Sequence, residues 1–139
     1  MKEEFRKYKS KIILVLVVLL FFYISPYVKR PLKDIHLSEI ESIVVAMPPR
    51  GGTVLVEDED QLKILISALN QVEVFNRTIP PFMSLGQPVE FIINFNEART
   101  LKVIEYGSYM KIGNNGYNAM RSPSQQLSRL ANELLGTGF

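Results

Sequence analysis

Few side chains in this sequence are of the kinds that carry out chemistry, and none is arranged for it. The chain has no cysteine, which excludes disulfides, thiolate catalysis and cysteine-ligated metals. Its only histidine, His36, has Asp34 and Glu39 nearby. A catalytic or metal-binding histidine needs partners held by rigid elements, and a single histidine also leaves no credible Ser–His pair. We therefore expect His36 to be an exposed polar residue.

Four consecutive acidic residues, Glu57 to Asp60, form the densest charge cluster. A calcium loop needs alternating oxygen ligands, a turn glycine and a later bidentate acid, and that spacing is missing. Acidic residues are instead favoured in the first turn of a helix. We expect no metal, no cofactor and no catalytic residue, so the chain is predicted not to be an enzyme. Carboxylates distant in sequence remain free to converge in space, which leaves an unrecognised hydrolase or small-ligand carrier as the alternative.

A proline-rich loop at residues 78–88 is the candidate binding segment. Its large apolar residues are Ile79, Phe82, Met83 and Leu85. Such a loop either folds back over the core or forms a partly exposed apolar patch that a partner protein covers. The sequence leaves both alternatives open, and we take these four residues as the possible partner-binding loop.

The elements that position these residues follow from hydrophobic periodicity and from turn residues. Strands are predicted at residues 40–47, 53–57, 72–75, 89–95, 100–106, 109–112 and 117–120. Asp58 is expected to cap a helix that ends near Asn70, with Gln61 in capping-box position. A last helix is expected to start at the cap Ser122 and to end at Gly136.

The predicted order of elements is ββαβββββα. Asn115-Gly116 is the strongest hairpin signal and is expected to be the turn before the last strand. The last four strands should form an antiparallel meander. The pattern therefore predicts an α+β fold, with an N-terminal transmembrane helix followed by a curved antiparallel sheet that carries two helices on one face.

The segment Ile12 to Ile24 is an uninterrupted apolar run of thirteen residues. As a helix it is about 20 Å long, against a hydrocarbon core of about 30 Å, and a cleavable signal peptide has a run of similar length. No small residues follow at a cleavage site, and the uncharged segment 25–28 extends the run, so we expect a retained transmembrane anchor at residues 11–28. The anchor residues are Lys11, Ile12, Leu16, Leu20, Tyr23, Tyr27 and Lys29.

Basic residues set the predicted orientation and location. Five precede the apolar run and three follow it closely, which places the N-terminus in the cytoplasm. The predicted organisation is a basic tail at 1–10, the anchor at 11–28, a stalk at 29–38 and an extracytoplasmic domain at 39–139. The chain is thus expected to be a single-pass cell-membrane protein with its C-terminal domain outside, and secretion after cleavage is the alternative.

The charge of the folded part excludes one class of partner. From residue 31 onward nine Lys or Arg residues stand against twelve Asp or Glu residues, a net charge of −3. A nucleic-acid-binding surface needs a basic stripe, so no nucleic-acid partner is expected.

The apolar helix without a cleavage site, the strand–turn–strand unit, the helix EDEDQLKILISALNQV and the meander ending in GNNGYNAM together support a resemblance. The chain resembles a group of small uncharacterised extracytoplasmic proteins of Gram-positive bacteria, which are membrane-tethered or lipoproteins. The resemblance covers about residues 40–135 and carries over no functional residue, and this chain departs from the lipoproteins because it lacks the lipidated cysteine. We expect a membrane-anchored binding or accessory module that contacts another envelope protein or a peptide.

Overall fold

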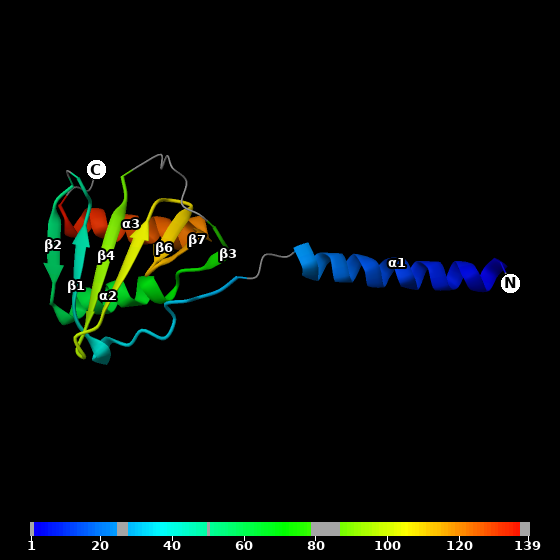
Figure 1. Ribbon diagram of the computed structural model, residues 1–139, viewed down its shortest axis with the longest axis horizontal. Coiled ribbons are helices and arrows are strands. Elements are labelled where there is room, and N and C mark those ends of the chain that lie inside the picture. The colour runs from blue at the N-terminus through cyan, green and yellow to red at the C-terminus, as the bar shows by residue number, and fades with distance from the viewer. Residues whose placement is uncertain (1, 25–27, 50, 79–86, 137–139) are drawn as a thin grey trace.

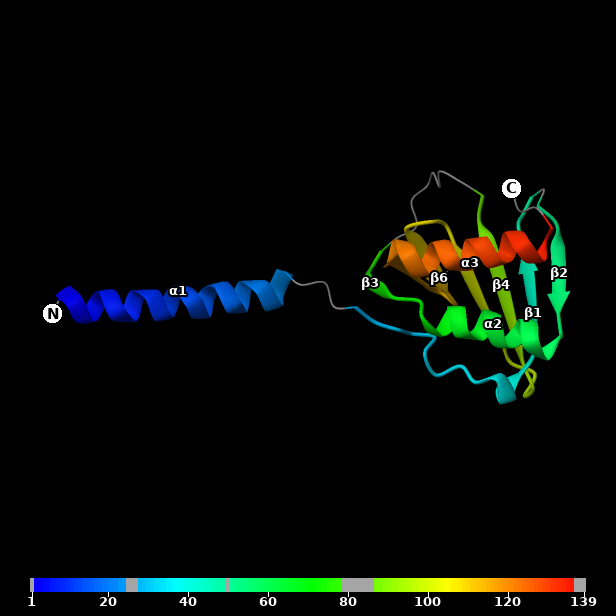
Figure 2. The same cartoon turned by 180° about the vertical axis from the view of Figure 1, so that it is seen from behind.

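The computed structural model describes residues 2–24, 28–49, 51–78 and 87–136. Its fold is α+β, and the predicted order ββαβββββα is confirmed. Helices α2 and α3 cover one face of a single antiparallel sheet, and no described helix covers the other, which we call the open face (Figures 1 and 2). The elements are α1 Lys2–Ile24, the 3-10 helix η1 Leu37–Glu39, β1 Ile40–Ala46, β2 Thr53–Val56, α2 Glu59–Asn70, β3 Val74–Arg77, β4 Val89–Phe95, β5 Thr100–Glu105, β6 Tyr109–Ile112, β7 Asn115–Ala119 and α3 Arg121–Leu134.

The described strands lie in the order β2-β1-β4-β5-β6-β7-β3. The hairpin β1–β2 and the meander β4–β5–β6–β7 are both as predicted. The hairpin joins the meander through β1 and β4, while β3 pairs with β7 at the far side. As a result β2 and β3 are the two edge strands.

The core lies between the sheet and its two helices. Strand β4 alternates between buried and half-buried residues, so Phe91 and Ile93 point to the helices. Helix α2 begins as predicted, because the side chain of Asp58 accepts a hydrogen bond of 3.0 Å from the Gln61 backbone N–H. An apolar stripe on each helix faces the sheet: Leu62, Leu65, Ile66 and Leu69 on α2 are buried, as are Leu127 and Ala131 on α3.

Two predicted local signals are wrong. The N-cap of α3 is Met120 and makes no side-chain hydrogen bond, so Ser122 is not the cap. The β6–β7 turn consists of Gly113 and the residue after it, because Ile112 pairs with Asn115 and Gly113 has a φ of 59°. Gly116 lies in the strand instead, where a Cβ atom would come within 2.2 Å of the Tyr109 hydroxyl oxygen.

The segment 29–38, predicted to be a stalk, packs onto the domain. Leu32 is 1% exposed and Ile35 is 8% exposed, and both belong to the core. Lys29 exchanges two backbone hydrogen bonds with Val74 of β3, at 2.8 and 2.9 Å. The folded domain therefore starts about ten residues earlier than predicted.

The prediction of a transmembrane helix is wrong. Within the described residues, no helix combines the length and the apolar character that crossing a membrane requires. Helix α1 starts at Lys2 and ends at Ile24, and most residues of its first half are charged. Residues 25–27 of the predicted extension lie outside the described residues. The remaining run is about 20 Å long, well short of a hydrocarbon core.

The residues assigned to the anchor have other surroundings. Lys11 and the helical positions Ile12, Leu16, Leu20 and Tyr23 are exposed on α1. Tyr27 lies outside the described residues. Lys29, expected at the end of the span, is part of the β-bridge to β3.

Candidate binding surface

The open face of the sheet carries an apolar row across adjacent strands. Val44 on β1 lies directly between Leu55 on β2 and Ile92 on β4. Side chains alternate between the two faces of a strand, and the neighbours of these residues point into the core, so all three point away from the helices. Leu55 is 54% exposed, and Val44 and Ile92 are half-buried. We call Leu55, Val44, Ile92 and Ile104 the open-face patch.

Ile104 extends the patch onto β5 through a second row. It lies between Glu90 of β4 and Lys111 of β6. An antiparallel sheet with one solvated face ordinarily has polar residues at such positions. Here each of four adjacent strands has one large apolar side chain at an outward position, beside polar ones.

Charged and polar side chains lie beside the Leu55–Val44–Ile92 row, and one ion pair separates that row from Ile104, because Lys102 is opposite Ile92 and Glu90 is opposite Ile104. Lys102 Nζ lies 3.0 Å from Glu90 Oε2 in an ion pair that joins β5 and β4 across the open face. Asn94 donates a hydrogen bond of 2.9 Å to the Ser42 hydroxyl further along β4 and β1. An apolar centre with a polar rim is the usual composition of a protein–protein interface.

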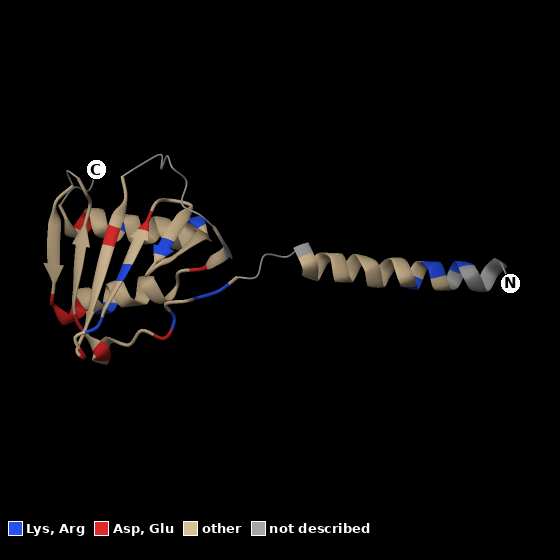
Figure 3. Cartoon of the chain, in the orientation of Figure 1, with Lys and Arg blue, Asp and Glu red and all other residues tan. Residues whose placement is uncertain are grey.

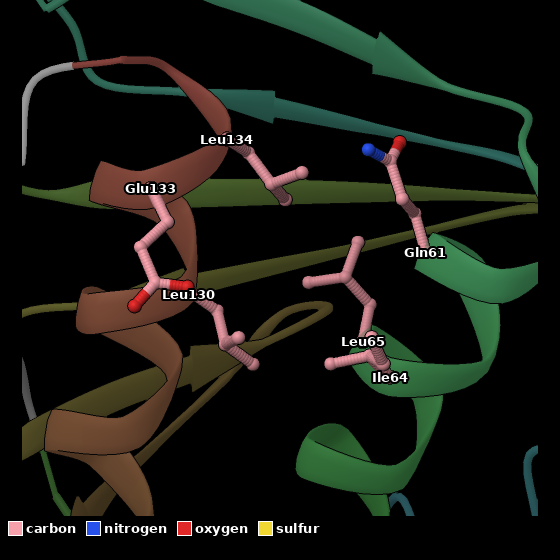
Figure 4. Close-up of a pocket in the computed structure, with 6 residues that line it drawn as sticks. All are labelled: Gln61, Ile64, Leu65, Leu130, Glu133 and Leu134. Carbon is pink, nitrogen blue, oxygen red and sulfur yellow. The ribbon is translucent and has the colours of Figure 1, made fainter.

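A groove between α2 and α3 is the second apolar feature, on the opposite side of the sheet. It has a volume of about 270 Å³ and is drawn in Figure 4. Leu65 and Ile64 on α2 face Leu130 and Leu134 on α3 across it. Gln61 and Glu133 supply its polar groups. Among the described residues that line the groove, Glu133 is the one carboxylate and there is no histidine.

The most deeply buried carboxylate, Glu105, fastens α3 to the sheet. It is 2% exposed and accepts hydrogen bonds from the Gly107 backbone N–H and the Ser128 hydroxyl. The Ser124 hydroxyl oxygen lies 2.5 Å from both Glu105 Oε1 and the Gly107 carbonyl oxygen. These donors satisfy the carboxylate within the fold. The cluster therefore has a structural role. This role was not predictable from the sequence, because the members of the cluster come from β5 and α3.

Tyr109 is the one buried tyrosine on the open side of the sheet, as far as the described residues show. Its ring centroid lies 5.7 Å from that of Tyr106, with the planes tilted by 48°. Its hydroxyl is buried and has no hydrogen-bond partner among the described residues. Burial and the neighbouring Tyr106 phenol raise the pKa of Tyr109 above its ordinary value.

The residues singled out from the sequence are not brought together in one site. The predicted partner-binding loop residues Ile79, Phe82, Met83 and Leu85 lie outside the described residues. His36 is exposed and precedes η1. The acids Glu57 to Asp60 lead into α2, and no group of three or more metal-ligating side chains occurs in the part of the chain that the structure describes.

The open-face patch was missed by sequence reasoning, although a signal was present. The run Ile43-Val44-Val45 and the run Phe91-Ile92-Ile93 lack the alternation expected of a strand with one solvent-exposed face.

Comparison of the chain with protein-family models, with curated proteins and with solved structures finds no significant match.

Proposed function

We propose that the folded domain is a binding module and that the open-face patch is the surface through which it contacts a partner protein. The observation that carries the proposal is the row Leu55–Val44–Ile92 on the open face of β2, β1 and β4. These three strands lie side by side in Figure 1. Apolar surface of this kind on a folded domain marks interaction sites. The partner is expected to present an apolar patch of its own.

The rim specifies the chemistry of that partner further. Glu90, Lys102 and Lys111 place both signs of charge beside the apolar centre. Complementary charges on a partner fix the register of an interface more than they add affinity. A protein surface with an apolar centre and charges of both signs would match this face.

The proposal extends to location. Helix α1 begins with basic residues and continues with an apolar run, which is typical of an export signal. We propose that the domain works outside the cytoplasm. Alkaline phosphatase is active only after export, so a fusion of this enzyme after residue 139 should be active, and an inactive, stable fusion would contradict the location.

Co-isolation with matched variants tests the binding surface. In the face variant, Val44→Thr and Ile92→Thr keep β-branched side chains but place hydroxyl groups in the apolar row. Ile64→Thr is the control, because Ile64 is an exposed apolar residue on α2, behind the sheet. Proteins co-isolated with the full chain would be quantified by mass spectrometry.

The face variant should recover about tenfold less of the partner, corresponding to a loss of about 1.4 kcal/mol. The Ile64→Thr variant should recover as much as the wild type. Thermal unfolding of each variant would verify that the fold is retained. Equal recovery by the folded face variant and the wild type would overturn the proposal.

A further inference from the structure

The two edge strands of the sheet, β3 and β2, differ in how far other parts of the chain cover them. At the β3 edge, Lys29 forms two backbone hydrogen bonds with Val74 and so covers part of the strand. At the other edge, β2 pairs only with β1 within the described part of the chain. An uncovered edge strand presents unpaired backbone groups to any extended chain that approaches.

The hydrogen-bond pattern shows which backbone groups of β2 face outward. Met47 N–H donates to the Gly52 carbonyl oxygen at 3.0 Å, which makes this a hydrogen-bonded pair of the β1–β2 hairpin. Hydrogen-bonded pairs alternate in an antiparallel ladder, so Val54 and Val56 bond to β1. The N–H and C=O groups of Thr53 and Leu55 therefore point away from the sheet.

The side chains of β2 do not protect this edge. Thr53 to Val56 contains no lysine and no proline, the residues that commonly block edge pairing. Leu55 presents its outward backbone groups and, on the open face, an exposed side chain. A chain added at this edge would thus place its own side chains next to the open-face patch.

Acidic residues lie where β2 ends. Glu57, Glu59 and Asp60 are exposed between the strand and the first turn of α2, and Figure 3 shows this part of the ribbon coloured as acidic. In an antiparallel addition, the N-terminal end of the incoming peptide lies beside the C-terminal end of β2. Basic residues at that end of the peptide would meet these carboxylates.

We propose that β2 binds an extended peptide segment of a partner protein by antiparallel strand addition, and that this segment has alternating apolar residues preceded by basic residues. The inference rests on the proposed function and names its mode. Backbone hydrogen bonds to Thr53 and Leu55 supply the affinity, and the acids after β2 supply the direction and the charge preference.

The probe for this inference is a synthetic peptide with two lysines followed by three Val-Thr repeats, and the matched peptide has two glutamates in place of the lysines. Amide hydrogen exchange of the full chain would be followed by NMR with and without each peptide. The lysine peptide should slow exchange of the Thr53 and Leu55 amides by about tenfold or more. The glutamate peptide should bind about tenfold more weakly because its charges repel the acidic cluster.

Leu55→Pro and Leu55→Ala form a matched pair of variants. Proline at position 55 removes the outward N–H but no hydrogen bond to β1. Edge strands tolerate proline at such a position. Both variants lose the leucine side chain, but only Leu55→Pro loses the outward donor. Affinity for the lysine peptide should fall at least about fivefold further in Leu55→Pro than in Leu55→Ala, with both variants folded by circular dichroism.

The outcomes separate the two proposals. Equal affinity of folded Leu55→Pro and Leu55→Ala would overturn strand addition, as would protection at β3 or in the α2–α3 groove instead of β2. Protection of the Leu55 amide without any peptide would indicate pairing of two copies of this chain and would also overturn it. In each of these cases a loss of partner in the Val44→Thr, Ile92→Thr variant would still support the binding surface.

Discussion

At the scale of single residues, Tyr109 shows how a position can be fixed by packing that no motif announces. Its ring packs against Gly116 so closely that a Cβ atom there would lie 2.2 Å from the hydroxyl oxygen. The sequence pattern Asn115-Gly116 predicted a turn because glycine is typical of hairpin turns. The glycine is needed for close approach instead, and only the neighbouring strand reveals this.

The buried hydroxyl of Tyr109 leads to a pH prediction. Because the pKa is raised from 10.0, the folded chain holds the phenol proton more tightly than the unfolded chain. This contribution to stability is complete below pH 10 and is lost as the pH rises through the raised pKa. The wild-type free energy of unfolding should therefore fall between pH 8 and about pH 11, and more steeply than in Tyr109→Phe.

Urea unfolding at the two pH values would measure the difference. At pH 8 the Tyr109→Phe variant should be as stable as the wild type or up to about 1 kcal/mol more stable, since it removes a buried hydroxyl that has no partner among the described residues. A variant that lost several kcal/mol at pH 8, or that kept the full pH dependence, would contradict this description of Tyr109.

At the scale of elements, α3 is held to the sheet by hydrogen bonds as well as by its apolar stripe. Ser128→Ala removes one donor to the buried Glu105 carboxylate and should lower the free energy of unfolding by about 1–3 kcal/mol. Ser122→Ala is the matched control on the same helix, because Ser122 is exposed and is not the N-cap. It should change the stability by less than about 0.5 kcal/mol.

Denaturant unfolding of the two variants would decide between the structure and the sequence pattern. If Ser122→Ala were the more costly change, the capping role predicted from the Ser-Pro sequence would be restored and the role of Ser128 refuted. Sequence rules single out Ser122 and give no sign of the role of Ser128, because the partner of Ser128 lies 23 residues away on β5.

The types and the order of the elements were predictable from local patterns. Which strands are neighbours in the sheet was predictable only in part. The cap at Asp58 and the alternation of β4 are local and were recovered. The pairing of β3 with β7 joins segments about forty residues apart, so no turn or period signals it. The open-face patch depends on a second long-range pairing, that of β1 with β4, which places Ile92 beside Val44 although they are far apart in the chain.

At the scale of the whole molecule, helix α1 and the domain are separate parts of the chain. The apolar side chains of α1 are exposed, and α1 lies apart from the sheet in Figure 1. The segment 29–38, in contrast, contributes Leu32 and Ile35 to the core. The stability of the domain should therefore depend on this segment and not on α1.

Two truncated chains test this division. A chain that starts at residue 28 should unfold within about 2 °C of the full chain, because it keeps the whole core. A chain that starts at residue 39 loses Leu32 and Ile35 and should be less stable by about 3–6 kcal/mol, or fail to fold. Thermal unfolding followed by circular dichroism would compare them, and equal stability of the two would contradict the place of this segment in the core.

The central claim is that the open face of the sheet is the surface that meets a partner, and the direct measurement is site-specific photocrosslinking. A benzophenone amino acid would replace Leu55 in one chain and Ile64 in another, two positions that are 54% and 55% exposed on opposite sides of the sheet. The structure predicts a discrete crosslinked product from position 55 and none from position 64. A product from position 64 alone would contradict the claim.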